Sequence, residues 1–152
     1  MNRGDWQILL HIQVHCEDIA KFIERFGKDY DIFTEDRAYF NAVSMCILQI
    51  GELANSLSEE FRNETKDEMP WGMIRGMRNW LAHAYAETDE NIIWETAIND
   101  IPSLLTFCNK VIDFNKDNFT EKVSIRKALK EIKAKPDLND RKNKHKNNEY
   151  ER

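Results

Sequence analysis

The chain has 152 residues, 41% of them hydrophobic, which suits a single domain with one buried core. Residues 1–119 carry 11 Lys and Arg against 21 Asp and Glu, whereas residues 120–152 carry 11 against 6. The acidic body argues against broad non-specific nucleic-acid binding, and no apolar run or leader predicts membrane insertion or export. We therefore expect a cytoplasmic protein with no membrane partner.

Apolar residues recur every three or four positions from about Asp5 to Phe26, which predicts a first core helix. Asp5 is a favourable N-cap, and Gly27 is a favourable stop. The chain also contains three widely spaced cysteines among apolar neighbours. Their odd number indicates reduced core thiols rather than disulfides: Cys16, Cys46 and Cys108.

A loop over residues 28–33 leads to Thr34, which can cap a long second helix over residues 35–61. Its apolar positions keep the helical period, so it is expected to form another wall of the core. Gly51 inside this helix costs about 1 kcal/mol relative to alanine, and such glycines usually allow another helix to approach closely. Glu52 beside it is expected to be solvated, with a salt bridge to the polar face of the next helix as the alternative.

Residues 62–68 are polar and predict a loop before Pro70, which suits the first turn of a third helix. This helix carries a guanidinium, an amide, an imidazole and a phenol within about two turns, between Arg78 and Tyr85. At about 100° per residue, the helix has two faces. An apolar face, expected to pack into the core, carries Met73, Met77, Trp80 and Leu81. A polar face carries Arg75, Arg78, Asn79 and His83 around the small side chain of Ala82.

The polar face suits a phosphate ligand, because arginine offers a fixed fork of charged donors and histidine exchanges protons near neutral pH. Together they suffice for acid–base cleavage of RNA, in which the ribose 2′-hydroxyl is the nucleophile and no metal is required. Arg78 and His83 are about 140° apart around a straight helix, so they do not easily meet on one phosphate. A second copy of this face, packed about a two-fold axis, would bring both residue types into one cleft.

The polar run after Tyr85 predicts the end of the third helix, and Thr88 or Asp89 can cap a fourth helix over residues 89–114. Pro102 predicts a kink in this helix or a division into two shorter ones, because proline removes a hydrogen bond and clashes with the preceding turn.

The C-terminal region, residues 120–152, is basic. A short amphipathic helix is predicted over residues 123–132, and the lysine- and asparagine-rich remainder is expected to be disordered. This tail is expected to be solvated, with an RNA-contacting or partner-binding arm as the alternative.

The segment Met77–Tyr85, preceded by Met69-Pro70-Trp71, resembles the HEPN superfamily, in particular the HepT-like toxins of bacterial toxin–antitoxin pairs. The motif within it is an arginine and a histidine separated by four residues, with a tyrosine two positions further on. Three other segments are also similar to that family, so the resemblance covers roughly residues 5 to 114: Gln49–Ala54, Asn91–Trp94 and Ile101–Leu105.

The resemblance implies an all-α fold, an up-and-down bundle of four to five helices, which we assign to residues 1–119. It implies a homodimer with a composite active cleft and metal-independent endoribonuclease activity. Arg78 and His83 would be the catalytic pair and Asn79 a supporting residue, while Arg75 on the same face is expected to help bind substrate. Tyr85 matches the tyrosine that a cognate nucleotidyltransferase antitoxin modifies with AMP.

Two other functions remain open at this point. The polar face could hold a nucleotide or RNA without cutting it, as a non-catalytic binding module. Alternatively, the chain could be an interaction partner of a minimal nucleotidyltransferase, with Tyr85 as the point of exchange. No Gly-rich phosphate loop is present, so no nucleotide cofactor is expected, and no metal site is expected either.

Overall fold

The computed structural model describes the backbone of residues 1–83 and 89–134 and the side chains of residues 1–81 and 89–119. All regular secondary structure in these residues is helical, which confirms the all-α prediction. The chain divides into two compact units, Met1–Asn115 and Lys116–Arg152. Among the helices described, none combines the length and the apolar character that a membrane span requires.

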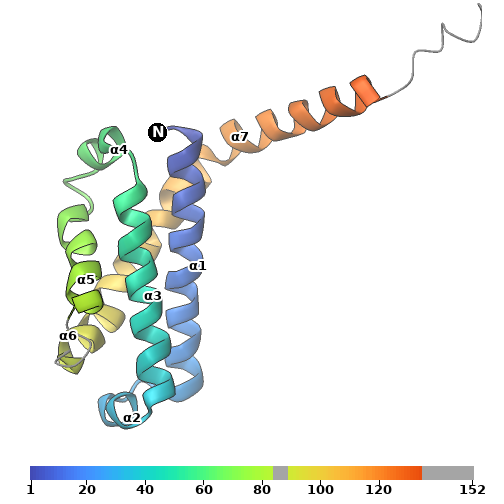
Figure 1. Ribbon diagram of the computed structural model, residues 1–152. Coiled ribbons are helices and arrows are strands. Elements are labelled where there is room, and N and C mark those ends of the chain that lie inside the picture. Colours follow the sequence, from blue (N-terminus) through green and yellow to red (C-terminus); the bar gives the residue numbers. More distant parts are fainter. Residues whose placement is uncertain (84–88, 135–152) are drawn as a thin grey trace, which may run out of the picture. The chain divides into compact units, whose positions relative to one another are not determined.

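The first unit is a bundle built around α3 (Figure 1). α3 packs against α1 on one side and against α5 on the other, and buried side chains of the first part of α7 complete the core. The long helices are α1 (Arg3–Phe26), α3 (Arg37–Ser56), α5 (Trp71–His83) and α7 (Ile101–Ala134). The short connecting helices are α2 (Tyr30–Glu35), α4 (Glu59–Glu64) and α6 (Glu90–Glu95).

The start of α1 differs from the prediction. Asn2 rather than Asp5 is the N-cap, and its side chain accepts a hydrogen bond from the backbone N–H of Asp5 at 2.9 Å. Asp5 is only 2% exposed, and its carboxylate accepts hydrogen bonds from the N–H and the hydroxyl of Ser58, both at 2.7 Å. The buried carboxylate therefore joins α1 to the start of α4. The helix ends at Phe26 as predicted, and Gly27 follows with a φ of 105°.

The short helices were not predicted, because several capping residues compete along the connections. Asp36, not Thr34, caps α3 by accepting from the N–H groups of Ala38 and Tyr39. The predicted second helix also ends early, since Leu57 is extended and Ser58 caps a new helix, α4. Side-chain acceptors at closely spaced positions thus divide a segment whose apolar period alone suggests one long helix.

The predicted fourth helix is divided near Pro102. A π-helical segment, η1 (Thr96–Asp100), joins α6 to α7, and the N–H of Ile101 bonds to the carbonyl of Thr96, five residues back. Pro102 has no N–H to bond to the carbonyl of Ile98, so the widened turn accommodates the proline while the helix continues. α7 extends to Ala134 and therefore includes the helix predicted over residues 123–132.

All three cysteines are buried and free, as predicted for core thiols. Burial raises the pKa of Cys46 to about 11 and that of Cys108 to about 12. Burial, followed by the neighbouring Cys108 and Cys46, raises the pKa of Cys16 further still. The thiols therefore stay protonated at neutral pH, which makes them part of the packing rather than nucleophiles.

Aromatic residues fix where α5 begins. The buried ring of Trp71 lies 5.7 Å from the ring of Phe107 and 6.0 Å from that of Phe61, between centroids. Its indole N–H donates to the hydroxyl of Thr65 at 2.8 Å, and the carbonyl of Pro70 accepts from the first turn of the helix. This anchoring determines the direction in which the side chains further along α5 project.

Candidate functional site

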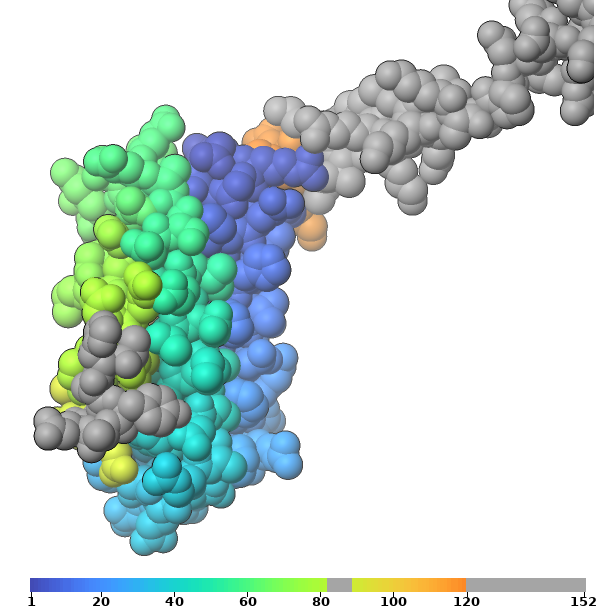
Figure 2. All heavy atoms as spheres, in the orientation of Figure 1, coloured from blue at the N-terminus to red at the C-terminus, as the bar shows by residue number. Residues whose placement is uncertain are grey.

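The polar face of α5 lies beside the C-terminal half of α3, at a point of close contact. Figure 2 shows the atoms of α5 next to those of α3, with α1 on the other side of α3. A Cβ atom added at Gly51 would lie 2.8 Å from the Cβ of Arg78 and 3.2 Å from the carbonyl oxygen of Ile74. Only glycine permits this approach, so the predicted role of Gly51 is confirmed.

Arg78 is held in place by an ion pair across this contact. Its Nε pairs with Oε1 of Glu52, and the two side chains are 38% and 45% exposed. The expectation that Glu52 is simply solvated is therefore wrong, and the alternative of a salt bridge holds. A half-exposed pair contributes only about 0–1 kcal/mol to stability, so its main effect is to orient a guanidinium that solvent can still reach.

Arg75 lies one turn before Arg78 and makes a different contact. Its Nε donates to Oδ1 of Asn55 at 3.0 Å. Among the residues whose side chains are described, Arg75 has no carboxylate partner. Its charge therefore meets a neutral amide rather than an anion.

Asn55 was not predicted as a site residue, although the spacing of residues in the sequence indicates its contact. Glu52 and Asn55 are three positions apart, as are Arg75 and Arg78. In two antiparallel helices, this matched spacing brings the side chains together turn by turn.

The other predicted site residues are only partly described. Asn79 is exposed on α5, where a ligand can reach it. His83 is the last residue of α5. Its side chain and the whole of Tyr85 lie outside the described residues, so their assigned roles remain predictions. The described part of the candidate site thus consists of Arg78 and Glu52, with Arg75 and Asn55 one turn away.

The apolar face of α5 is rotated relative to the prediction. Leu81 is buried as predicted, and Met77 and Trp80 are partly buried against the core, but Met73 is 75% exposed. The reason is that α5 comes closest to α3 at Gly51, through Ile74 and Arg78, so Met73 lies away from this contact. Met73 and Met77 therefore border a space that the core does not fill.

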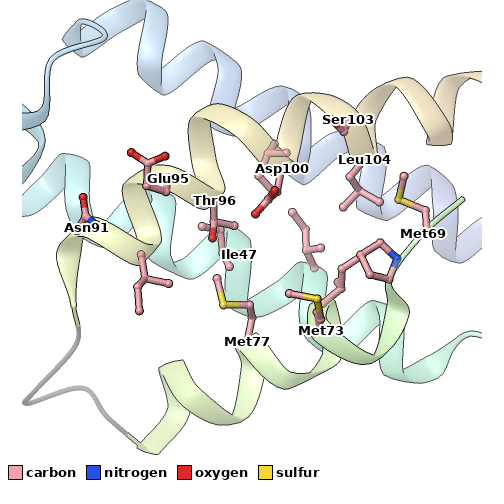
Figure 3. A pocket seen from close by; sticks show the side chains of 15 residues that line it. Ile47, Met69, Met73, Met77, Asn91, Glu95, Thr96, Asp100, Ser103 and Leu104 are labelled. Carbon is pink, nitrogen blue, oxygen red and sulfur yellow. The ribbon is translucent and has the colours of Figure 1, made fainter. Parts of the chain in front are cut away.

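That space is an apolar pocket of about 430 Å³ between α5 and the α6–η1–α7 segment. Figure 3 shows Met73 and Met77 pointing from α5 into it, with Glu95 and Asp100 on the other side. Carboxylates there would repel a phosphate, so this pocket is a poor candidate for nucleic acid. In the ranges 1–81 and 89–119, no three potential metal-ligating side chains gather.

Comparison with known proteins gives a consistent result. Residues 12–111 match the family model described as "Ribonuclease HepT-like". A protein of Caldanaerobacter subterraneus subsp. tengcongensis, named as a candidate RNase, is 35% identical over 96 residues, which cover 63% of this chain and 83% of that protein. The "Probable ribonuclease HepT" of Thermococcus cleftensis is 34% identical over 95 residues, covering 59% of this chain and 86% of that protein.

A further relative, from Methanocaldococcus jannaschii and also named as a candidate RNase, is 32% identical over 104 residues, with 68% of this chain and 87% of that protein covered. No solved structure matches the chain at a significant level. The family match extends over the bundle and includes the segment that carries Arg78 and His83. The chain therefore belongs to the HepT-like ribonuclease family, in agreement with the resemblance of its motif residues.

Proposed function

We propose that the chain is a metal-independent endoribonuclease toxin of a bacterial toxin–antitoxin system, which cuts RNA in a cleft at a homodimer interface. The observation that carries the proposal is the guanidinium of Arg78, oriented by Glu52 and accessible to solvent, in a chain of the HepT-like ribonuclease family. His83, five positions further along α5, supplies the second chemical function.

The proposed reaction divides the work between these two residues. The ion pair with Glu52 engages Nε of Arg78, and the Nη groups are the donors that we assign to the scissile phosphate. His83 takes the proton of the 2′-hydroxyl, whose oxygen attacks phosphorus, and a protonated His83 imidazole gives a proton to the 5′-oxygen as its bond to phosphorus breaks. The products are a 2′,3′-cyclic phosphate and a 5′-hydroxyl. Arg78 stabilises the charge that develops on the phosphoryl oxygens.

A homodimer would overcome the angular separation of the two catalytic positions on α5. Positions 78 and 83 are about 140° apart around a straight helix, so Arg78 and His83 of one chain do not easily meet on one phosphate. Packing the polar faces of two chains about a two-fold axis would let acid, base and arginine come from different protomers. The exposed Asn79 and the adjacent Arg75 would line the same cleft and help bind the RNA.

Regulation by a nucleotidyltransferase-type antitoxin is part of the same proposal. Tyr85 follows His83 by two residues, and attachment of AMP there would add a negatively charged phosphate close to the cleft. The cleft must bind an RNA phosphate, so this added charge would repel the substrate. Modification would therefore silence the enzyme without unfolding it.

The experiment that tests the proposed function is an RNA cleavage assay in EDTA. It compares the wild type with His83→Ala, after circular dichroism has shown equal folding of the two proteins. We expect the wild type to cut RNA without a metal and His83→Ala to lose cleavage. Cleavage by a well-folded His83→Ala protein would refute the assignment, and tight RNA binding without any product from the wild type would favour a binding module.

A further inference from the structure

A second cationic site lies at the start of α5. A pocket of about 340 Å³ opens between the end of α4 and the first turn of α5. Three cations, Arg62, Lys66 and Arg75, line it, and no carboxylate is among the described lining residues. In a body with about twice as many acidic as basic residues, a pocket of this charge is a local exception.

Hydrogen bonds hold Arg62 and the segment that carries Lys66. Nη1 of Arg62 donates to the carbonyl of Leu57 and, at 3.3 Å, to that of Asn55, so it caps the C-terminus of α3. The linker that carries Lys66 is fixed by Thr65, whose carbonyl accepts from the N–H of Met69 at 2.9 Å and whose hydroxyl accepts from the Trp71 indole. The pocket is therefore formed before a ligand arrives.

The charge of the pocket is not neutralised within the described part of the chain. None of its three cations has a carboxylate partner there, whereas Arg78 pairs with Glu52. Like charges that line one pocket repel one another, and a bound anion would relieve this repulsion. Gly72 in the wall leaves room, because a Cβ added there would meet nothing within 4 Å.

We propose that this pocket binds a backbone phosphate of the RNA substrate that flanks the scissile one. Arg75 borders the pocket and lies one turn from Arg78, about 4.5 Å along the axis of α5. A strand whose scissile phosphate lies at Arg78 therefore passes the pocket, so this inference rests on the proposed ribonuclease site. The only aromatic residue among the described lining residues, Trp71, is buried, so the pocket positions the strand through its backbone without reading bases.

The experiment measures binding of an oligoribonucleotide whose riboses carry 2′-O-methyl groups, which block the nucleophile. Lys66→Gln removes one exposed charge that has no hydrogen-bond partner among the described residues. We expect several-fold weaker binding at low salt. The slope of log Kd against log salt concentration should fall by about 0.7, the value for one phosphate contact on a single strand. With cleavable RNA, the loss should fall on KM rather than on kcat.

The matched control is Lys28→Gln, the same charge change at an exposed lysine between α1 and α2, at the other end of the bundle (Figure 1). Its salt slope should equal that of the wild type. Methylphosphonate groups, which neutralise one phosphate at a time, then locate the contact. Neutralising one phosphate beside the cleavage position should weaken binding to the wild type but not to Lys66→Gln.

Two results would overturn the inference. One is a salt slope and a methylphosphonate pattern in Lys66→Gln that match those of the wild type. The other is weaker binding of inorganic phosphate alone to Lys66→Gln with unchanged oligonucleotide binding, which would make the pocket a site for free anions. The probe is not cleaved, so the comparison of salt slopes tests the pocket even if the wild type proves to have no ribonuclease activity, and the loss of the proposed function can be told apart from the loss of this contact.

Discussion

Arg75 and Arg78 lie one turn apart on α5 and both reach α3, yet their surroundings differ. Arg78 pairs with the carboxylate of Glu52 and packs on Gly51, whereas Arg75 donates to the neutral Asn55 and borders the basic pocket. The ion pair with Glu52 fixes the orientation of the Arg78 guanidinium. The positive charge of Arg75, by contrast, has no carboxylate partner among the described residues. This difference supports the proposal that Arg78 acts in catalysis and that Arg75 helps to hold the substrate.

The largest expected effect tests this division directly. Arg78→Gln should lower kcat about 100- to 1000-fold, because it removes a charged donor from the charge that develops in the transition state. Arg75→Gln should mainly raise KM, several-fold, because it weakens attraction to the RNA backbone in the ground and transition states alike. Single-turnover and steady-state cleavage kinetics distinguish the two. Equal effects of both variants on kcat would remove the distinction.

The close contact beneath Arg78 can be broken at Gly51. Gly51→Ala should lower the free energy of unfolding by about 1–3 kcal/mol, because the new methyl group would overlap the backbone and Cβ of Arg78. Urea denaturation measures the loss, and cleavage should fall with it as Arg78 is displaced. Unchanged stability would show that the helices can separate at little cost.

Glu52→Ala isolates the effect of orientation. We expect kcat to fall about tenfold, because a guanidinium without its partner samples orientations that do not meet the phosphate. The free energy of unfolding should change by less than about 1 kcal/mol, since the pair is half exposed. Glu52→Gln keeps an acceptor oxygen and should retain more activity than Glu52→Ala. Full activity of Glu52→Ala would show that Arg78 works without this carboxylate.

The smallest effect is expected at Gly76, the matched control for Gly51. A Cβ added at Gly76 would meet nothing within 4 Å, so Gly76→Ala gains helix propensity without overlap. It should raise the free energy of unfolding by about 0.5–1 kcal/mol. Urea denaturation, as for Gly51→Ala, measures this gain in stability. A loss of stability would mean that this face of α5 is less open than the structure shows.

Features that depend on neighbours in sequence could be predicted from the sequence. Repeats of three and four residues indicated the long helices, Gly27 indicated the end of α1, and apolar neighbours indicated that the cysteines are buried. The short helices were not predicted from the sequence. Capping residues such as Asp36 and Ser58 start new helices within a segment whose apolar periodicity alone suggests one continuous helix. The motif of Arg78 and His83 likewise pointed to the ribonuclease family.

By itself, therefore, the sequence determined the helical class, the family and the arginine that belongs to the motif. Only the tertiary structure decided how α5 is rotated, with Met73 exposed and Arg78 against α3. It also decided that Glu52 pairs with Arg78 and that Arg62, Lys66 and Arg75 share one pocket. The physical reason is that periodicity gives the faces of a helix only relative to its own axis. The point at which α5 meets another helix is set by the space that Gly51 leaves on α3.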